Sequence, residues 1–161
     1  MAHGDPIAKE ASVRALKAEL RANGRVSSGP MAGRRLMILT TTGAKSGEPR
    51  ETVVTISRDG DRYVIAASQS GAPANPAWFH NLVAHPEVVV EVEMERFNAR
   101  ATVTSGTERD RLWEHHVSER SVMRDYQAKT TRVIPVIALD RIAARGDAGG
   151  HSSGRRSGPT R

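Results

Sequence analysis

The chain has 161 residues, which suits one domain with a buried core and flanking segments. It has no cysteine, so disulfides and thiolate metal sites are excluded and a reducing cytoplasm is expected. The net charge of +6 and the pI near 10.5 suggest a polyanionic partner such as nucleic acid, anionic lipid or a charged cofactor. No apolar run approaches the roughly 20 residues of a membrane span, so we expect a cytoplasmic protein, with contact at the inner face of the cell membrane as an alternative.

Composition divides the chain into three parts. Residues 1–30 are expected to form an N-terminal helix and linker, 31–142 the folded domain, and 143–161 a basic tail rich in glycine and serine. We expect the tail to be disordered, because it contains almost nothing that could be buried. Part of the positive charge lies in this tail and therefore says little about the folded domain.

The first predicted element is a helix over residues 7–23. Asp5 and Pro6 supply a helix start, and Gly24 supplies a stop just past its end. A narrow apolar stripe runs along the helix, and lysine and arginine occupy its other faces. We expect the helix to pack on the domain. Contact with an anionic membrane and a lid over a cofactor are the alternatives.

Runs rich in β-branched residues predict most of the remaining elements. The predicted strands span 35–41, 50–57, 62–68, 87–94, 96–105 and 134–139. The predicted helices span 77–84, 107–119 and 122–129, with Asn75 as the N-cap of the first. A turn at Asp59-Gly60 joins the second and third strands. Mostly antiparallel strands with helices between them predict an α+β fold with a barrel-like sheet rather than a doubly wound parallel sheet.

Residues 40–50 form the most informative stretch, a connection between the first two strands. Two glycines let backbone N–H groups turn toward a ligand, while Ser46, Lys45 and Arg50 add a hydroxyl and charge, which suits a phosphate or a polycarboxylate. A polar hairpin loop with two solvated cations is the alternative. A nucleotide-binding phosphate loop is excluded, because Ala44 stands where that motif needs glycine and a strand follows instead of a helix.

Familiar catalytic and metal-binding patterns are weak in this sequence. No serine lies in a nucleophile elbow, and neither His80 with His85 nor His115 with His116 has the spacing of a metal site. We therefore expect no metal and read these histidines as solvated or hydrogen-bonded. Glutamates at positions 91, 93 and 95 alternate with apolar residues and are predicted to form the solvent face of a strand.

A second candidate for ligand binding is the predicted helix over 77–84. Trp78 and Asn81 are three residues apart and share a helix face. A flat ring beside an amide suits a planar heterocycle, which stacks on one group and hydrogen-bonds the other. A core anchor and a residue near a helix cap are the alternative interpretation of this pair.

Four blocks of sequence, at 39–50, 59–68, 75–86 and 125–136, follow one another in the chain. The first holds Thr-Thr-Thr-Gly and Lys-Ser-Gly, the second Asp-Gly and Tyr63-Val64, the third Asn-Pro and Trp78, and the fourth Asp-Tyr-Gln through Ile-Pro-Val. In combination and in this order they resemble the deazaflavin-dependent nitroreductase and quinone reductase family of actinobacteria. The similarity runs from about residue 36 to residue 139.

The resemblance implies a split β-barrel related to flavin-binding oxidases and the 8-hydroxy-5-deazaflavin coenzyme F420, which carries a phosphate and an oligoglutamate tail. Around the anionic part of the coenzyme it places Ala44, Lys45, Ser46, Gly47 and Arg50. Along the deazaflavin ring and its side chain it places Val53, Ala66, Ala67, Ser68, Gln69, Ala77, Trp78, Phe79, His80 and Asn81. FMN, which also carries a phosphate, is the alternative cofactor.

The implied reaction is hydride transfer from C5 of the reduced deazaflavin to a quinone or another planar electrophile, including nitroaromatic compounds. The implied substrate-lining residues are Trp78, Met123 and Tyr126, and Tyr126 is the candidate proton donor. Arg120 and Met123 stand where some members carry tyrosines over the ring, so the resemblance does not define the acceptor.

Two further departures affect the coenzyme side, where Ala44 and Gln69 replace common cations. A non-catalytic deazaflavin-binding or flavin-binding protein, or a basic nucleic-acid binder, is the alternative function. Aromatic and basic residues are not interleaved as a nucleic-acid surface requires, so we expect no nucleic-acid partner. The sequence does not define an oligomeric state.

Overall fold

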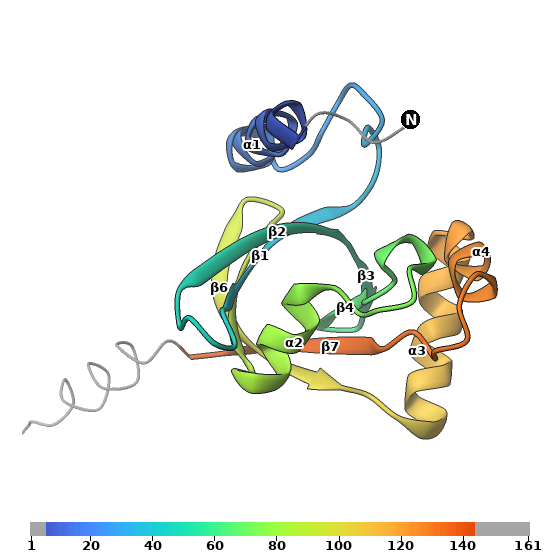
Figure 1. The fold of residues 1–161 in the computed structure, drawn as a ribbon. Coiled ribbons are helices and arrows are strands. Elements are labelled where there is room, and N and C mark those ends of the chain that lie inside the picture. The colour runs from blue at the N-terminus through green and yellow to red at the C-terminus, as the bar shows by residue number, and fades with distance from the viewer. Residues whose placement is uncertain (1–5, 144–161) are drawn as a thin grey trace, which may run out of the picture.

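The chain folds around a seven-stranded sheet, seen as the curved ring of arrows in Figure 1. This computed structural model describes residues 6–143. The strands are β1 (Leu36–Thr42), β2 (Pro49–Thr55), β3 (Ser57–Asp59), β4 (Arg62–Ala66), β5 (Glu87–Val92), β6 (Glu95–Val103) and β7 (Val136–Ile142). Their order in the sheet is β2-β1-β5-β6-β7-β4-β3, and every neighbouring pair is antiparallel. The predicted α+β class is confirmed.

The two edge strands of this sheet, β2 and β3, are neighbours in the sequence. Only Ile56 separates them; it is buried, and its N–H donates to the carbonyl of Arg35 at 2.9 Å. Because edges joined by one residue must lie close together, the sheet curls until its two ends meet, and the predicted barrel-like sheet is confirmed. The prediction of one continuous strand over 50–57 is wrong, because the chain passes from one sheet edge to the other within it.

Two hairpins, β1–β2 and β3–β4, lie on either side of this closure. β1 and β2 pair from Leu36 with Thr55 to Thr42 with Pro49, so their connection is the stretch that the sequence singles out. The Asp59-Gly60 turn joins only the short β3 to β4. The rest of the predicted second strand has β1 as its partner.

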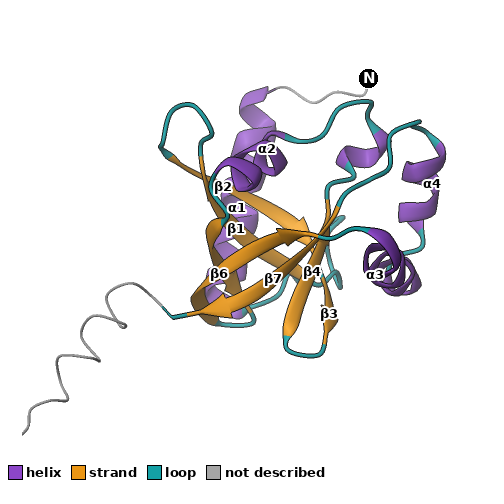
Figure 2. Ribbon diagram, turned by 90° about the horizontal axis from the view of Figure 1, so that it is seen from below, coloured by secondary structure: helices purple, strands orange, loops and turns teal. Residues whose placement is uncertain are grey.

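Alternate residues of the strands fill the barrel. Met37 and Leu39 of β1 are fully buried in the main core with residues of β4, β5, β6 and β7, whereas Ile38 packs in a separate cluster with Leu20 of the first helix. A third cluster around Leu112 joins two further helices to the outside of β4 and β7. Figure 2 shows these two helices, α3 and α4, together beside β3 and β4.

Within residues 6–143, four α-helices and one short 3-10 helix lie around the sheet. They are α1 (Pro6–Asn23), η1 (Gln69–Gly71), α2 (Ala77–Ala84), α3 (Gly106–Glu119) and α4 (Val122–Ala128). All four helices were predicted within about two residues of these bounds. The N-cap prediction for α2 is wrong: Pro76 takes that place, and Asn75 instead accepts a hydrogen bond from Arg132 at 2.7 Å.

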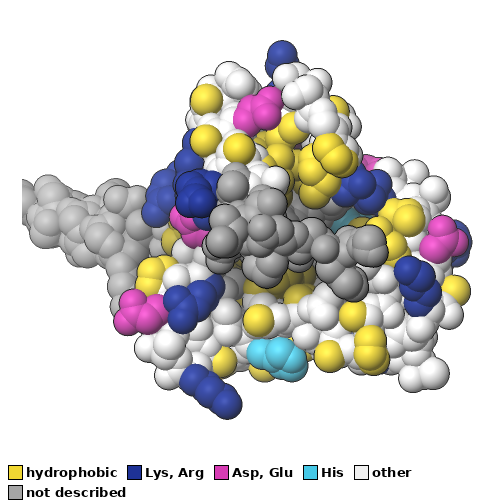
Figure 3. Space-filling model, turned by 45° about the horizontal axis from the view of Figure 1, so that its top comes forward, with side chains coloured by type: hydrophobic (Ala, Val, Ile, Leu, Met, Phe, Trp, Pro, Cys, Tyr) yellow, Lys and Arg dark blue, Asp and Glu magenta, His cyan; other side chains and the backbone are white. Residues whose placement is uncertain are grey.

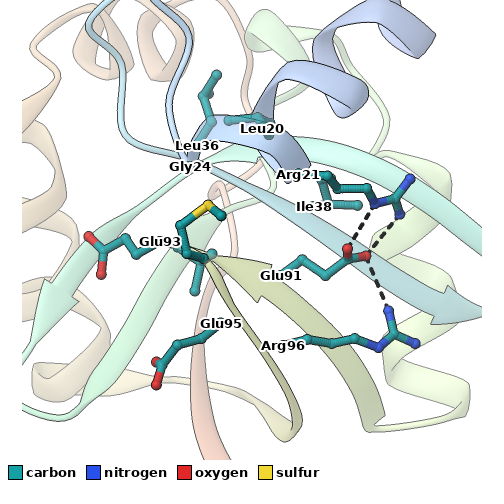
Figure 4. Close-up of a pocket in the computed structure, with 11 residues that line it drawn as sticks. Leu20, Arg21, Gly24, Leu36, Ile38, Glu91, Glu93, Glu95 and Arg96 are labelled. Atoms are coloured by element: carbon teal, nitrogen blue, oxygen red, sulfur yellow. Dashed lines mark hydrogen bonds and ion pairs between the residues drawn. The ribbon is translucent and has the colours of Figure 1, made fainter.

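Helix α1 packs on β1, as expected from its apolar stripe. Figure 4 shows the hollow between them, where Arg21 of α1 reaches Glu91 of β5 at 2.8 Å, and Arg96 approaches the same carboxylate at 3.3 Å. Glu91 is therefore not on a plain solvent face, and its pKa is lowered by the hydrogen bond from Arg21. The predicted alternation also ends at Glu93 and Met94, which form a turn with φ of 53° and 67°. The prediction that residues 91, 93 and 95 form the solvent face of one strand is therefore wrong, because Glu91 pairs with Arg21 of α1 and Glu93 lies in a turn.

Two expectations fall on residues that the structure does not describe. Asp5, the proposed start of the first helix, and all but the first residue of the predicted tail lie outside residues 6–143. Within the described part of the chain, none of the helices has the length and hydropathy needed to cross a bilayer. The same part contains no group of three or more histidine, aspartate or glutamate side chains arranged to hold a metal.

Candidate active site

The connection between β1 and β2 forms a compact loop with an exposed tip. The N–H of Gly43 donates to the carbonyl of Glu48 at 2.8 Å, and that of Gly47 donates to the carbonyl of Gly43 at 3.0 Å. Gly47 has φ of 73°, the left-handed region that favours glycine. A Cβ at Gly43 would collide with Oγ of Ser46. This backbone therefore requires the glycines that the sequence supplies, and it leaves Lys45 exposed at the tip.

Asn81 of α2 fixes this loop. Its Oδ1 accepts a hydrogen bond from the N–H of Ala44 at 2.9 Å, and its Nδ2 donates to Oγ1 of Thr41 at 3.1 Å. Asn81 is buried, and the polar atoms of a buried amide are normally hydrogen-bonded, as they are here. The amide thus serves to position the loop against α2.

Loop and helix enclose a first pocket of about 650 Å³. Its lining is Gly43, Ala44, Lys45, Ser46, Arg50, Glu51, Thr52, Ala77, Trp78, His80 and Asn81. Among the described residues, no carboxylate forms an ion pair with Lys45 or Arg50. Glu51 is turned away to α1, where hydrogen bonds from Lys17 and then Arg21 lower its pKa. The first pocket therefore presents uncompensated positive charge.

A second pocket, of about 200 Å³, adjoins the first. Its lining is Arg34, Val53, Val54, Thr55, Ala66, Ser68, Gln69, Ser70, Trp78, Arg120, Met123 and Tyr126. Trp78 belongs to both linings and also packs on the main core. One indole thus forms a common wall between a cationic pocket and a pocket of mixed character.

Strained backbone borders the second pocket. Gln69, Ser70 and Gly71 all have positive φ, at 43°, 54° and 82°. Two of these residues carry side chains, for which the left-handed region costs roughly 1–2 kcal/mol each. A Cβ at Gly71 would come within 2.6 Å of the carbonyl of Tyr126, so only glycine lets this turn approach α4 so closely.

Arg132 holds the strained turn in place. Its guanidinium donates to the carbonyls of Ala67 at 3.1 Å, Ser68 at 2.9 Å and Ala72 at 2.9 Å, and to Oδ1 of Asn75 at 2.7 Å. Burial lowers the pKa of Arg132, although an arginine keeps its charge in a protein. One side chain therefore organises the whole connection between β4 and α2.

The structure brings most of the predicted site residues to the two pockets. The predicted residues in the first lining are Ala44, Lys45, Ser46, Arg50, Ala77, Trp78, His80 and Asn81. Those in the second are Val53, Ala66, Ser68, Gln69, Trp78, Met123 and Tyr126. Gly47, Ala67 and Phe79 lie outside both linings: Gly47 shapes the loop, Ala67 is fully buried, and Phe79 packs on the main core.

Two cations of the second pocket were not among the predicted site residues. Arg34 comes from the segment before β1, and Arg120 is the C-cap of α3. The sequence marks Arg120 only as a departure from the family pattern, and it carries no signal for Arg34, whose position depends on how the linker crosses the barrel. On the face shown in Figure 3, lysine and arginine side chains occur in separate groups rather than in one continuous patch.

Comparisons with known proteins agree with this geometry. The family described as F420H(2)-dependent quinone reductase matches residues 12–141. The F420H(2)-dependent quinone reductase Rv1261c of Mycobacterium tuberculosis H37Rv is 42% identical over 123 residues, which cover 74% of this chain and 82% of that protein. A solved F420-H2 dependent reductase, FDR-A, is 33% identical with a TM-score of 0.62, covering 66% of this chain and 95% of its own.

A further solved structure, described as a domain-swapped dimer, is 29% identical with a TM-score of 0.64 and covers 82% of this chain and 99% of its own. The family match spans far more than half of the chain, and the M. tuberculosis relative exceeds 30% identity over most of it. The chain therefore belongs to the F420H(2)-dependent quinone reductase family, whose members are oxidoreductases with reduced F420 as hydride donor.

Proposed function

We propose that this chain transfers a hydride from reduced F420 to a quinone or another planar electrophile. In this proposal the anionic portion of F420 lies in the first pocket, and the acceptor meets the deazaflavin ring in the second pocket, which residues implied for both of them line. The observation that carries this assignment is the pair of adjoining pockets with Trp78 as a common wall. A cationic pocket suits the anionic portion of a cofactor, and a smaller neighbour suits a compact second ligand. Family membership supports the cofactor, and the names of the relatives support a quinone.

The residues of the first pocket fit F420. Its phosphate and carboxylates need cationic or N–H donors, and Lys45 and Arg50 lack carboxylate partners among the described residues. Ser46 adds a hydroxyl 3.4 Å from Nη2 of Arg50. We propose that these three residues bind the anionic portion. Asn81 then acts indirectly, because it holds the loop that carries them.

When bound, reduced F420 supplies a hydride, and the overall exchange turns quinone and F420H2 into hydroquinone and F420. The quinone must gain one proton besides the hydride. Tyr126, half-buried in the second pocket beside Met123, is the proposed donor of that proton to the acceptor oxygen. Trp78 and the turn at Gln69–Gly71 limit where the ring of the acceptor can lie, and this positioning is the protein's main contribution.

The cofactor assignment is tested by titrating the protein with oxidised F420 while its fluorescence is followed. We expect saturable binding that weakens in Lys45→Ala and is unchanged in Arg100→Gln, which removes a charge from the exposed face of β6. Absence of saturation, or equal weakening in both variants, would refute the proposed binding site.

The acceptor assignment is tested by turnover. Reduced F420 is mixed with menadione and, separately, with a nitroaromatic compound, and the return of oxidised F420 is followed over many cycles. We propose menadione as the better acceptor, because a quinone needs only the hydride and one proton, whereas a nitro group must also lose an oxygen as water. A protein that binds F420 but turns over neither compound would be a carrier, and the proposed activity would be wrong.

A further inference from the structure

We propose that the second pocket selects electron acceptors that carry an anionic group, such as a sulfonate or a carboxylate, and that Arg34 and Arg120 bind this group. The inference rests on the proposed function, because it names the class of acceptor that the same site takes. It concerns Arg34, to which the resemblance gives no role, and Arg120, which the resemblance marks only as a departure from a family tyrosine.

Two arginines from distant parts of the chain line this pocket. Arg34 lies in the segment before β1, and Arg120 caps the C-terminal end of α3. Both are partly buried, and both line the pocket together with Met123 and Tyr126. The fold therefore places two fork-shaped donors at the site where the electron acceptor is proposed to lie.

No carboxylate of the described residues pairs with either arginine. The adjacent Arg35, in contrast, reaches Glu93 at 3.3 Å and Glu119 at 3.6 Å. Glu119 directly precedes Arg120, but its carboxylate is also approached by His115 at 3.4 Å. The lining of the second pocket includes no aspartate or glutamate among the residues described. Its positive charge is thus uncompensated.

Partial burial removes water from a guanidinium, and a bound anion is the partner that restores its hydrogen bonds. A cation at a helix C-terminus is favoured by the helix dipole, which accounts for Arg120 alone. It does not account for Arg34, which belongs to no helix and faces the same hollow. Two cations that line one pocket without a carboxylate in its lining favour an anionic ligand.

The anionic part of F420 does not need these two arginines. Lys45 and Arg50 supply cations in the first pocket, on the other side of Trp78. The acceptor is therefore the ligand whose charge Arg34 and Arg120 are placed to meet. If the acceptor were a neutral quinone, neither guanidinium would gain a charged partner when it binds.

The test compares two acceptors with the same ring, 1,4-naphthoquinone and 1,4-naphthoquinone-2-sulfonate. For each protein the measured quantity is kcat/KM for the sulfonate divided by kcat/KM for the neutral quinone. Dividing this ratio for a variant by the ratio for the wild type cancels the different intrinsic reactivities of the two quinones. The chain has no cysteine, so thiol addition to the quinones does not interfere.

Arg34→Gln and Arg120→Gln should each lower the ratio by about tenfold, because each removes a hydrogen bond to a charged group. The matched control is Arg124→Gln, which removes the same charge from α4, where Arg124 pairs at the surface with Glu114 at 2.8 Å. We expect the control to change the ratio by less than about twofold. Equal ratios in all four proteins would overturn the proposal.

Binding to the cofactor-free protein gives a second readout. Trp78 lines the pocket, so the sulfonate should quench tryptophan fluorescence saturably, with about tenfold weaker binding in Arg120→Gln. Quenching that is equal in the variant and the wild type would contradict the proposal. If neither quinone is turned over, the proposed function fails, while this binding still decides the anion site. If both are turned over with unchanged ratios, only the anion site fails.

Discussion

Replacing His116 by asparagine should remove a pH-dependent part of the stability. His116 is buried where α3 meets β3, with Nδ1 2.7 Å from Oγ of Ser57. Its Nε2 has no hydrogen-bond partner among the described residues. Burial, followed by the charges of His115 and Arg120, lowers the pKa of His116 from 6.5 to about 4. The imidazole is therefore neutral in the folded protein at pH 7.

A pKa that is lower in the folded state means that the unfolded chain takes up the proton first as the pH falls. The contribution of His116 to stability is therefore complete above its unfolded pKa of 6.5 and is lost as the pH falls toward its folded pKa of about 4. At about 1.4 kcal/mol per pKa unit, the full loss is about 3 kcal/mol. Between pH 7 and pH 5, the same linkage gives a loss of about 2 kcal/mol.

Urea unfolding at pH 7, 6 and 5 measures this loss. Asparagine keeps an acceptor near Nδ1 of His116 but does not titrate, so the stability difference between wild type and His116→Asn should shrink by about 2 kcal/mol over this range. His85→Asn is the matched control, because His85 is exposed at the C-cap of α2 and its replacement should leave the slope unchanged. A His116→Asn variant with the pH slope of the wild type would refute the assignment of a buried neutral histidine.

Three further changes test the site. Lys45→Ala should weaken F420 binding by about tenfold in a fluorescence titration while hydride transfer in the saturated complex stays nearly constant, because the proposed role of this charge is to bind the anionic portion. Tyr126→Phe should lower kcat with little effect on F420 affinity, and unchanged kinetics would contradict its role as proton donor. Arg132→Met should lower the free energy of unfolding by about 2 kcal/mol in urea and raise KM for the acceptor, because four acceptors lose their donor.

Local patterns were enough to predict most of the fold. The helix over 77–84 and the β1–β2 hairpin depend on neighbouring residues, such as Pro76 and the two glycines of the loop, and both were predicted. The sequence does not predict the break at Ile56, because the residues on both sides of it have strand propensity. The change of partner strand, from β1 to β4, depends on barrel closure. Asn75 was misassigned because its true partner, Arg132, lies 57 residues further along the chain.

The residues of the candidate site also divide into those that a local motif indicates and those that only the tertiary fold brings to a pocket. Lys45, Ser46 and Trp78 lie in short motifs that carry their own chemical logic, so the sequence indicated them. The sequence carries no signal for Arg34 and marks Arg120 only as a departure from a family tyrosine, because a linker and a helix end come to line one pocket only in the tertiary fold. The strain at Gln69–Gly71 was equally hidden, since no sequence rule predicts positive φ for glutamine and serine.

The distribution of charge changes the meaning of the net charge of +6. Arginines on the sheet and helices are largely paired: Arg62 and Arg111 meet Asp59, and Arg21 meets Glu51 and Glu91. Among the described residues, the cations that line the two pockets have no such partners. Ion pairs at an exposed surface contribute little affinity for any ligand, whereas uncompensated cations in a pocket bind anions. We therefore propose that the unpaired basic residues of the folded part serve small anionic ligands in the two pockets that Trp78 lines.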